Sequence, residues 1–569
     1  MRRIPPLVVV LAAEVACSGS PTGPNPNPGP LPTPTVACAA VAPVQLAVGV
    51  HVVVDPAGTS GCVRFPAAGN SPTQYLVVLA STNGVRSSTG VQGGYLFRSS
   101  SPTVQSSAEP APSPAVSAEE LFPSPRSAAA EFDAALRERE RELLALPGSR
   151  AGLMTAPPVG AAPPPVGDVK SFKVCSNLQC SAFGTVMATA RFVDQHVAIY
   201  MDNSVPQNDT LQTADYAELG NAFNRYHYPI DTTAFGRESD LDDNGVVDIL
   251  MTDAVNALTP DCANGRIIGY FFGGDLLTGP NSNRAEVFYT LVPAPQSGNC
   301  NAVSRRAALD NLKPTLIHEF QHMISFNQHA LVRGGNAEET WLNEAMSHFA
   351  EELGGRLVPA AECIQFGFPS CRSQYTSGDI INAYNFLKNS ENFFLFFGSS
   401  STGTLEERGA DWLFLRWVLD HFSTDSLLAT QTTRALVATA LTGVSNIAAV
   451  TGGNVATMLP EELMAAYLDD GDDLPAESTG LLRFKSWGLR SIWLDPRNVS
   501  SFPAGFPIVP DPVGASFSRS GTLRAGSGHH FLVIQSANGP AIDVQVLKNS
   551  DGSPLDPTLQ ARYGVVRIR

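Results

Sequence analysis

The sequence predicts an α+β protein built from several domains, and three observations lead to this prediction. The chain has 569 residues, which exceeds the size of a single hydrophobic core. Short apolar runs separated by Gly, Pro and Asn recur near both ends, as in VGVHVVVD from residue 48, and this pattern is typical of β-strands. After residue 310, apolar residues repeat every three or four positions, which predicts helices. We therefore expect a large mixed domain flanked by small all-β domains.

Composition and charge point to an exported protein and away from nucleic-acid binding. Hydrophobic residues make up 43% of the chain and charged residues 16%, while Gly and Pro number 48 and 44. Such a composition is typical of soluble, loop-rich extracellular proteins with much β structure. A formal net charge of −16 without a basic stripe argues against binding to a phosphate backbone. We expect a monomer with no nucleic-acid partner, and acidic loops that attract divalent cations.

Residues 1–17 resemble a bacterial lipoprotein signal peptide. Two arginines precede an apolar run, Leu7–Ala13, which is too short to span a bilayer, and small residues lead to Cys17. Glu14 fits the processing site poorly, and an ordinary secretory signal is the alternative. The protein is therefore expected to be exported from a bacterial cell, either as an outer-membrane or cell-surface lipoprotein lipidated on Cys17 or as a secreted protein. The lipid anchor is the only membrane contact expected.

The cysteine count predicts disulfide bonds. Nine cysteines are present, so eight remain beside Cys17, and an even number in an exported chain favours disulfides. Connectivity does not follow from sequence, and pairing of neighbours is the simplest arrangement. That arrangement joins Cys38 with Cys62, Cys175 with Cys180, Cys262 with Cys300, and Cys363 with Cys371. Zinc binding by cysteines is disfavoured because no CxxC pair occurs.

Changes in composition divide the chain into consecutive segments. One charged helix, AAAEFDAALREREREL, interrupts the fourth segment; it is compatible with a propeptide, which the sequence leaves open. YLVVLASTNG from Tyr75 resembles FLVIQSANG from Phe531, a thin indication that the two terminal β modules are related. The segments are a signal peptide (1–17), a Pro-rich tether (18–36), a small β-sandwich domain (37–100), a Pro/Ser/Ala-rich linker (101–167), the central domain (168–490) and a C-terminal β domain (491–569).

The central domain begins with predicted strands and continues into helices. Strand-like runs occupy FGTVMATARFVDQHVAIYMD from residue 183, and a helical pattern follows in TADYAELGNAFNRYH from residue 213. An acidic loop and further strands come next. Helical periodicity then covers residues 311–329, 341–353, 409–422, 430–442 and 459–469.

The segment LIHEFQHMI, from Leu316, predicts a metal site. On a helix, residues four apart lie on one face, so His318 and His322 can point their imidazoles at one ion. Glu319 then lies beside that ion. Zinc lowers the pKa of a bound water toward neutrality, so a neighbouring carboxylate can take its proton.

A second predicted helix, TWLNEAMSHFAEEL from Thr340, supplies the third ligand. Glu344 lies on its apolar face, and a carboxylate buried there is costly unless it is paired or bound to metal. His348 follows one turn later, and we expect it to support the ligands rather than to bind the ion. His329 is expected to be a solvated residue at the end of the first helix.

HEFQH followed by WLNEAMSHFAEEL resembles the gluzincin metallopeptidases, most closely the hyicolysin type of bacterial neutral metalloprotease. The likeness covers roughly residues 170–480 and includes RIIGYFFGGDLL and NRAEVFYTLVP. It implies a zincin-like domain, a mixed sheet with active-site helices, in which His318, His322 and Glu344 bind one catalytic Zn²⁺. It also implies that Glu319 is the general base and acid of an endopeptidase acting on proteins or peptides.

The sequence departs from that resemblance in two respects. His348 stands where many gluzincins carry an acidic residue that orients a histidine, and Glu351 or Glu352 is expected to take over that task. The donor that stabilises the transition-state oxyanion is not evident. Tyr384 is our preferred catalytic donor over Tyr375 and His421.

The strand before the zinc helix bears on substrate binding. Residues 286–292, EVFYTLV, are rich in β-branched and aromatic residues. In zinc peptidases of this architecture, an edge strand at this place pairs with an extended substrate. An ordinary core strand is the equal alternative.

SDLDDNGVVDIL, from Ser239, resembles a calcium loop. Asp240, Asp242 and Asn244 alternate before a glycine, and Asp248 occupies position nine. Met251 replaces the glutamate at position twelve, so the loop is at best a shortened variant. We expect a structural Ca²⁺, and the alternative is an Asp/Asn-rich turn.

Three functions compete. The leading prediction is a secreted or surface-anchored zinc endopeptidase. A zinc exopeptidase is disfavoured because no GxMEN-type stretch is present. A catalytically inactive, peptidase-like binding or adhesion protein is disfavoured because Glu319 is retained.

Overall fold

The computed structural model describes residues 38–101 except 88, 128–150, 162–206, 211–259, 266–294, 302–397, 403–471 and 480–569. The predicted signal peptide, Cys17, the tether and the pair Cys262–Cys300 lie outside the described residues. Strands in several sheets and many helices make the described chain α+β, as the sequence predicts.

A β-sandwich combines strands from both ends of the chain. One sheet has five strands in the order β1-β15-β3-β13-β11, and the other has four in the order β12-β4-β14-β2. Side chains from both sheets fill the space between them, and Phe97 stacks on Phe531 with ring centroids 3.8 Å apart. The strands are β1 (His51–Val54), β2 (Cys62–Phe65), β3 (Thr73–Ser81), β4 (Gln92–Ser100), β11 (Asp511–Val513), β12 (Ser516–Arg524), β13 (Gly528–Gln535), β14 (Ile542–Leu547) and β15 (Ala561–Arg567).

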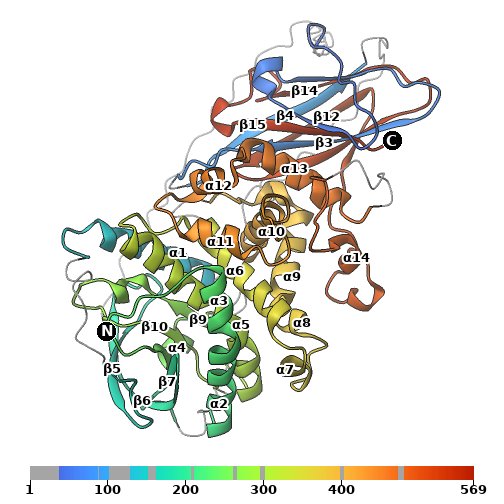
Figure 1. Cartoon of the computed structure of the whole chain (residues 1–569). Coiled ribbons are helices and arrows are strands. Elements are labelled where there is room, and N and C mark those ends of the chain that lie inside the picture. Colours follow the sequence, from blue (N-terminus) through green and yellow to red (C-terminus); the bar gives the residue numbers. More distant parts are fainter. Residues whose placement is uncertain are drawn as a thin grey trace, which may run out of the picture. The chain divides into compact units, whose positions relative to one another are not determined.

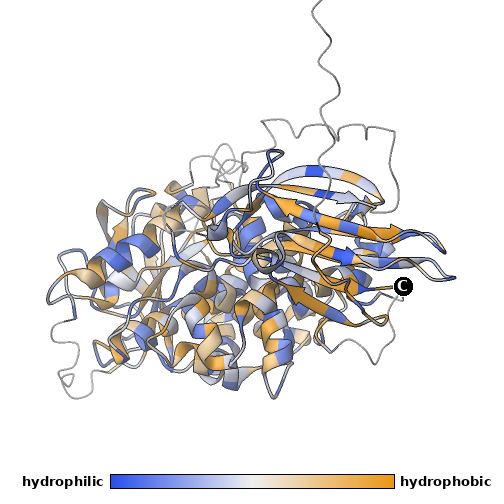
Figure 2. Ribbon diagram, turned by 90° about the horizontal axis from the view of Figure 1, so that it is seen from above, coloured by the Kyte–Doolittle hydropathy of each residue, from blue (hydrophilic) through white to orange (hydrophobic). Residues whose placement is uncertain are grey.

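The expectation of two separate β domains, 37–100 and 491–569, is therefore wrong. Blue strands from the first region lie between red strands from the second in both sheets (Figure 1). The two similar segments noted in the sequence pair directly, since Val77 of β3 lies opposite Phe531 of β13. Each region alone would leave central strands with open hydrogen-bonding edges, which promote unwanted association. Figure 2 shows the hydrophobic residues as long orange stretches on these strands.

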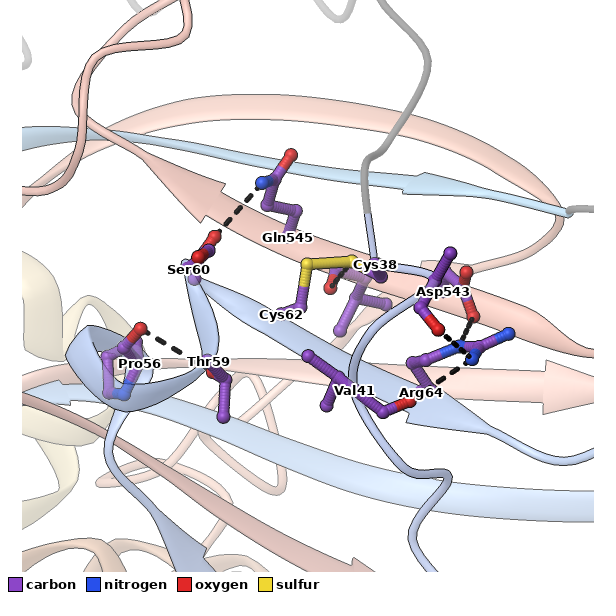
Figure 3. The surroundings of a disulfide bond; sticks show 12 residues. Cys38, Val41, Pro56, Thr59, Ser60, Cys62, Arg64, Asp543 and Gln545 are labelled. Atoms are coloured by element: carbon purple, nitrogen blue, oxygen red, sulfur yellow. Dashed lines mark hydrogen bonds and ion pairs between the residues drawn. A yellow bond between two sulfur atoms is a disulfide. The ribbon is translucent and has the colours of Figure 1, made fainter.

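The disulfides that the structure describes join sequence neighbours, as the simplest pairing predicts. Cys38–Cys62, Cys175–Cys180 and Cys363–Cys371 are bonded. Figure 3 shows the first of these at β2, on the face that also carries the ion pair between Arg64 and Asp543, whose atoms are 3.0 Å apart. This ion pair ties a strand of the N-terminal region to one of the C-terminal region.

The central sheet has the order β5-β6-β7-β8-β10-β9. β7, β8 and β10 run parallel, whereas β9 is antiparallel to β10. The outer strand beside the helices is thus β9, and β10 lies between β8 and β9. Of the two alternatives for residues 286–292, the structure therefore shows the core strand and not the edge strand, and β9 forms the edge. The strands are β5 (Val169–Cys175), β6 (Phe183–Asp194), β7 (Val197–Asp202), β8 (Val247–Met251), β9 (Gly269–Phe271) and β10 (Val287–Thr290).

Helices follow the predicted periodicity closely. The five predicted helical segments correspond to α5 with the π-helical turn Asn327–Val332, and to α6, α10, α11 and α13. The Ser304 hydroxyl accepts a hydrogen bond from the N–H of Ala307 and begins α5. The helices are α1 (Ala128–Ala145), α2 (Thr213–Ala222), α3 (Tyr228–Ala234), α4 (Asp253–Ala257), α5 (Arg305–Phe326), α6 (Thr340–Leu357), α7 (Ala361–Ile364), α8 (Cys371–Tyr375), α9 (Ser377–Lys388), α10 (Leu405–Phe422), α11 (Thr430–Val437), α12 (Gly443–Thr451), α13 (Val455–Leu468) and α14 (Leu489–Trp493).

Helix α13 packs against β3 and β15, and hydrogen bonds join the sandwich to the helices. His530 of β13 contacts the Leu463 carbonyl at 2.9 Å, and Ser390 donates to the Gly528 carbonyl at 2.6 Å. Among the described helices, none combines the length and the apolar character needed to cross a membrane.

Candidate metal centre

Two histidines of α5 and one glutamate of α6 converge on one point. The Nε2 atoms of His318 and His322 are 3.2 Å apart. The Glu344 carboxylate oxygens lie 3.5 Å from Nε2 of His318 and 3.3 Å from Nε2 of His322. All three side chains are buried. Two imidazoles and one carboxylate, with donor atoms within 4.8 Å of one another, form the donor set typical of a catalytic zinc site.

Helix packing explains this convergence. α5 and α6 contact each other along their apolar faces, where Leu316, Leu342 and Ala345 are buried. Four-residue spacing places both histidines on the face of α5 that meets α6. Glu344 occupies the middle of the opposing face, as the sequence predicts. The geometry therefore follows from two local helical patterns and one packing contact.

The Glu344 carboxylate is suited to hold a cation. Neither of its oxygens makes a well-aligned hydrogen bond to the described residues, although both are buried. Burial alone raises the pKa of this carboxyl, but Arg408 and His322 outweigh it and hold the pKa well below its usual range. An anionic, buried and underbonded carboxylate beside two imidazoles fits a divalent ion such as Zn²⁺.

Glu319 lies beside this cluster and is held by the central sheet. Its Oε2 accepts a hydrogen bond from the N–H of Phe271 in β9, at 2.7 Å. The side chain is 7% exposed and contributes to the cleft wall. The contact fixes a carboxylate next to the two histidines, where it can take or give a proton.

Glu351 of α6 orients the first histidine. Its Oε1 lies 2.7 Å from Nδ1 of His318 and 3.1 Å from Nδ1 of His348. Asp379 of α9 contacts the same His348 nitrogen at 2.8 Å. Burial lowers the pKa of His348, but Asp379 and Glu351 outweigh burial and raise it to about 9. Glu351 rather than Glu352 thus occupies the orienting position.

Glu352 serves a different network. Its carboxylate accepts hydrogen bonds from the indoles of Trp412 and Trp487 and contacts Arg356 and Arg416. Ser347 supports the second histidine, with its Oγ 3.0 Å from Nδ1 of His322.

A cleft of about 260 Å³ opens onto these groups. Its walls come from α5, α6, the β9 strand, α1 and Arg408. Pro314 of α5 also lines it and cannot donate to the Asp310 carbonyl one turn earlier; Gln374 lies 3.4 Å from that oxygen. The lining residues are Ala129, Phe132, Asp133, Arg266, Ile267, Ile268, Gly269, Tyr270, Asn311, Pro314, Thr315, His318, Glu319, His322, Glu344, His348, Glu351 and Arg408.

Comparison with known proteins agrees with this chemistry. No family model matches the chain. The neutral metalloprotease ShpI of Staphylococcus hyicus is 26% identical over 190 residues. The chain is similar to a metalloprotease. The matched stretch is 33% of this chain and 40% of the relative, so it spans less than half of that protein's length. This distant and partial likeness supports a metallopeptidase relationship.

Tyr384, the preferred catalytic donor in the sequence, is not among the residues that line the cleft. It lies in α9 with its hydroxyl 3.2 Å from the N–H of Ala504, and its ring packs on Trp493 and Phe502. The alternatives are also engaged elsewhere. Tyr375 contacts His227 at 2.8 Å, and His421 contacts the Arg483 carbonyl at 2.9 Å. The sequence could not show this, because an aromatic residue in an apolar helix face carries no signal about which cavity it meets.

His329 is fully buried, so the expectation of a solvated helix end is wrong. The chain continues as a π-helical turn through Val332, and His329 lies 3.7 Å from Glu338. Burial lowers the pKa of His329 to about 4, which favours its neutral form.

The acidic loop differs from the expected calcium ligand set. Asp240 and Asp242 lie together with Glu286, with one oxygen of each within 4.8 Å of the others. Asp248 instead pairs with Lys170 of β5 at 2.6 Å. Asn244 donates to Asp242 at 2.8 Å. Lys170 and Glu286 come from distant strands, so the spacing within the loop could not reveal them.

Proposed function

We propose that this chain is a zinc endopeptidase of the gluzincin, hyicolysin-like type, which hydrolyses peptide bonds in proteins. The observation that carries the proposal is the convergence of His318, His322 and Glu344 on one point with Glu319 beside them in an open cleft. The three converging residues would hold Zn²⁺. When bound, the ion would lower the pKa of a water and polarise the substrate carbonyl.

Glu319 would act as general base and general acid. Its carboxylate would take the proton of the attacking water and deliver it to the leaving amine. The hydrogen bond from Phe271 N–H holds one oxygen and leaves the other for this proton transfer. Glu351 would keep His318 oriented through its Nδ1.

The β9 strand would align the substrate. It forms the outer edge of the described sheet and lines the cleft from Ile267 to Tyr270. The Leu291 N–H donates to the Ile268 carbonyl, so Ile268 faces β10, and by strand alternation Gly269 and Phe271 point their backbone groups outward. The Phe271 N–H is occupied by Glu319, so an extended peptide could pair by β-addition with the Gly269 groups and the Phe271 carbonyl, which favours an endopeptidase over an enzyme that binds a chain end.

We also propose export of the protein, through the lipoprotein-like signal or by secretion, and a structural Ca²⁺ site. The calcium proposal rests on Asp240, Asp242 and Glu286. Asp248 is left out because it pairs with Lys170 at 2.6 Å, whereas Asp242 lies farther from that ammonium group, at 3.7 Å.

Purified full-length protein tests the enzymatic proposal. We expect one zinc ion per chain, casein hydrolysis that a zinc chelator abolishes, and a loss of at least about 10³-fold in kcat for Glu319→Gln, because the general base is removed. Metal analysis of the same sample also measures its calcium content, which tests the calcium proposal. Absence of zinc binding, or equal cleavage by wild type and Glu319→Gln, would refute the peptidase proposal and favour a binding protein.

A further inference from the structure

Helix α1, which lies in the segment predicted to be a linker, forms part of the cleft wall beside the metal centre. Ala129, Phe132 and Asp133 form part of the same wall as the zinc-site residues. The Phe132 ring meets Tyr270 edge to face with centroids 4.9 Å apart and is 2% exposed. This segment of the chain thus occupies space next to the groups that would perform hydrolysis.

Two α1 side chains bind backbone groups at the end of β9 and just beyond it. Arg137 donates to the Phe271 carbonyl at 2.6 Å, and Glu140 accepts the N–H of Gly273 at 2.6 Å. The two side chains also pair with each other at 3.1 Å. An added substrate strand needs such edge groups for its own hydrogen bonds. The helix and an extended substrate would therefore compete for one edge.

Asp133 extends this contact to the metal ligands. Its Oδ2 accepts a hydrogen bond from Arg408 at 2.9 Å, and the other terminal nitrogen of Arg408 lies 3.5 Å from Glu344. Asp133 thus neutralises a cation of the cleft wall. A buried ion pair of this kind persists only while both partners stay docked.

We propose that α1 is an inhibitory segment that keeps the peptidase latent by covering the β9 edge and pairing Asp133 with Arg408. The inference rests on the proposed peptidase function. Protein substrates would gain access once α1 leaves the cleft. Pro/Ser/Ala-rich sequences, 102–127 and 151–161, flank the helix on both sides, so cuts in both would separate it from the chain.

Substitutions on α1 give the first test and leave the zinc-site residues intact. In the full chain, Asp133→Asn with Arg137→Gln removes the charges that strengthen the contacts to Arg408 and to the Phe271 carbonyl, and it leaves Glu140 without its cation. We expect casein cleavage to rise at least about tenfold as the undocked population grows. Hydrogen exchange of segments 128–145 and 266–273 should also quicken, and this readout does not depend on activity. The matched control, Arg139→Gln with Glu142→Gln, removes a solvent-exposed pair of the same helix and should change neither.

Excision gives the second test, which covers the case in which the substituted helix stays docked. Recognition sequences for a site-specific protease are inserted within 102–127 and within 151–161, and the folded protein is cut at both. Departure of the α1 fragment on native size-exclusion, with a rise in casein cleavage, supports the proposal. Retention of the fragment, or departure without a rise, overturns it by showing that α1 is a permanent wall of the domain.

These results separate the two proposals. If α1 departs and zinc binds but cleavage merely stays at the wild-type level, inhibition is refuted while the peptidase stands. If neither form cleaves any substrate and zinc does not bind, the peptidase proposal itself fails.

Discussion

At the scale of single residues, the site depends on a chain of contacts rather than on its ligands alone. Glu351 joins His318 to His348, and Asp379 closes the far end of this chain. A carboxylate on Nδ1 fixes the imidazole tautomer that leaves Nε2 free to bind a metal. The sequence left Glu351 and Glu352 as equals. Only packing against Trp412 and Trp487 separates them, because those rings draw Glu352 away from the cleft.

Replacing Glu351 with Gln should weaken zinc binding by about 10–100-fold, since His318 loses its orienting anion. Competition with a chromogenic chelator measures the affinity directly. Glu406→Gln, on the first turn of α10, serves as the control and should bind zinc like wild type. Equal affinities for the two variants would mean that Glu351 plays no part in holding the metal.

At the scale of elements, helices were predictable and strand partners were not. Helices α5 and α6, which form the candidate metal centre, could be predicted from local patterns: the four-residue spacing of the histidines and an apolar face that continues for several turns. The parallel pairing of β10 with β8, which leaves β9 at the edge, and the pairing of β3 with β13 and β15 depend on segments far apart in the sequence. Strand periodicity shows which face is buried but not which strand lies alongside. Lys170 and Glu286 at the acidic loop escaped prediction for the same reason.

Two residues of β13 test the shared sandwich. Phe531 is fully buried and stacks on Phe97, whereas Ile534 is 41% exposed. Phe531→Ala should lower the free energy of unfolding by about 3–5 kcal/mol, and Ile534→Ala should change it by less than about 1 kcal/mol. Denaturant titration monitored by circular dichroism compares them. Similar losses of stability for both variants would contradict the structure, in which Phe531 is buried in the sandwich and Ile534 is exposed.

At the scale of the whole molecule, strands from the two ends of the chain form one sandwich and stabilise each other. Strands from the first hundred residues and from the last sixty pair with one another in both sheets. The ion pair Arg64–Asp543 and the buried contact of Phe97 with Phe531 cross between them. Removal of an N-terminal propeptide that included β1 to β4 would dismantle this sandwich. Processing limited to the region around α1 would leave it intact.

A single engineered cut within 102–127 tests whether the N-terminal and C-terminal strands stay associated. The N-terminal fragment should co-elute with the remainder in native size-exclusion, because β3 pairs on both sides with C-terminal strands, and the fragments should part only in denaturant. The described disulfides do not link them. Separate elution under native conditions would show that the sandwich does not bind its halves firmly.

The interleaved sandwich also governs when the protein can finish folding. Strands β1 to β4 emerge from the ribosome first and must wait for partners encoded more than four hundred residues later. Such long-range pairing is slow, and it leaves sheet edges open in the interval. If the protein is exported as proposed, this delay would help, because the chain would stay unfolded enough to be threaded across a membrane. A prematurely terminated chain would lack the C-terminal strands, so its unpaired strands would be exposed and it would be degraded.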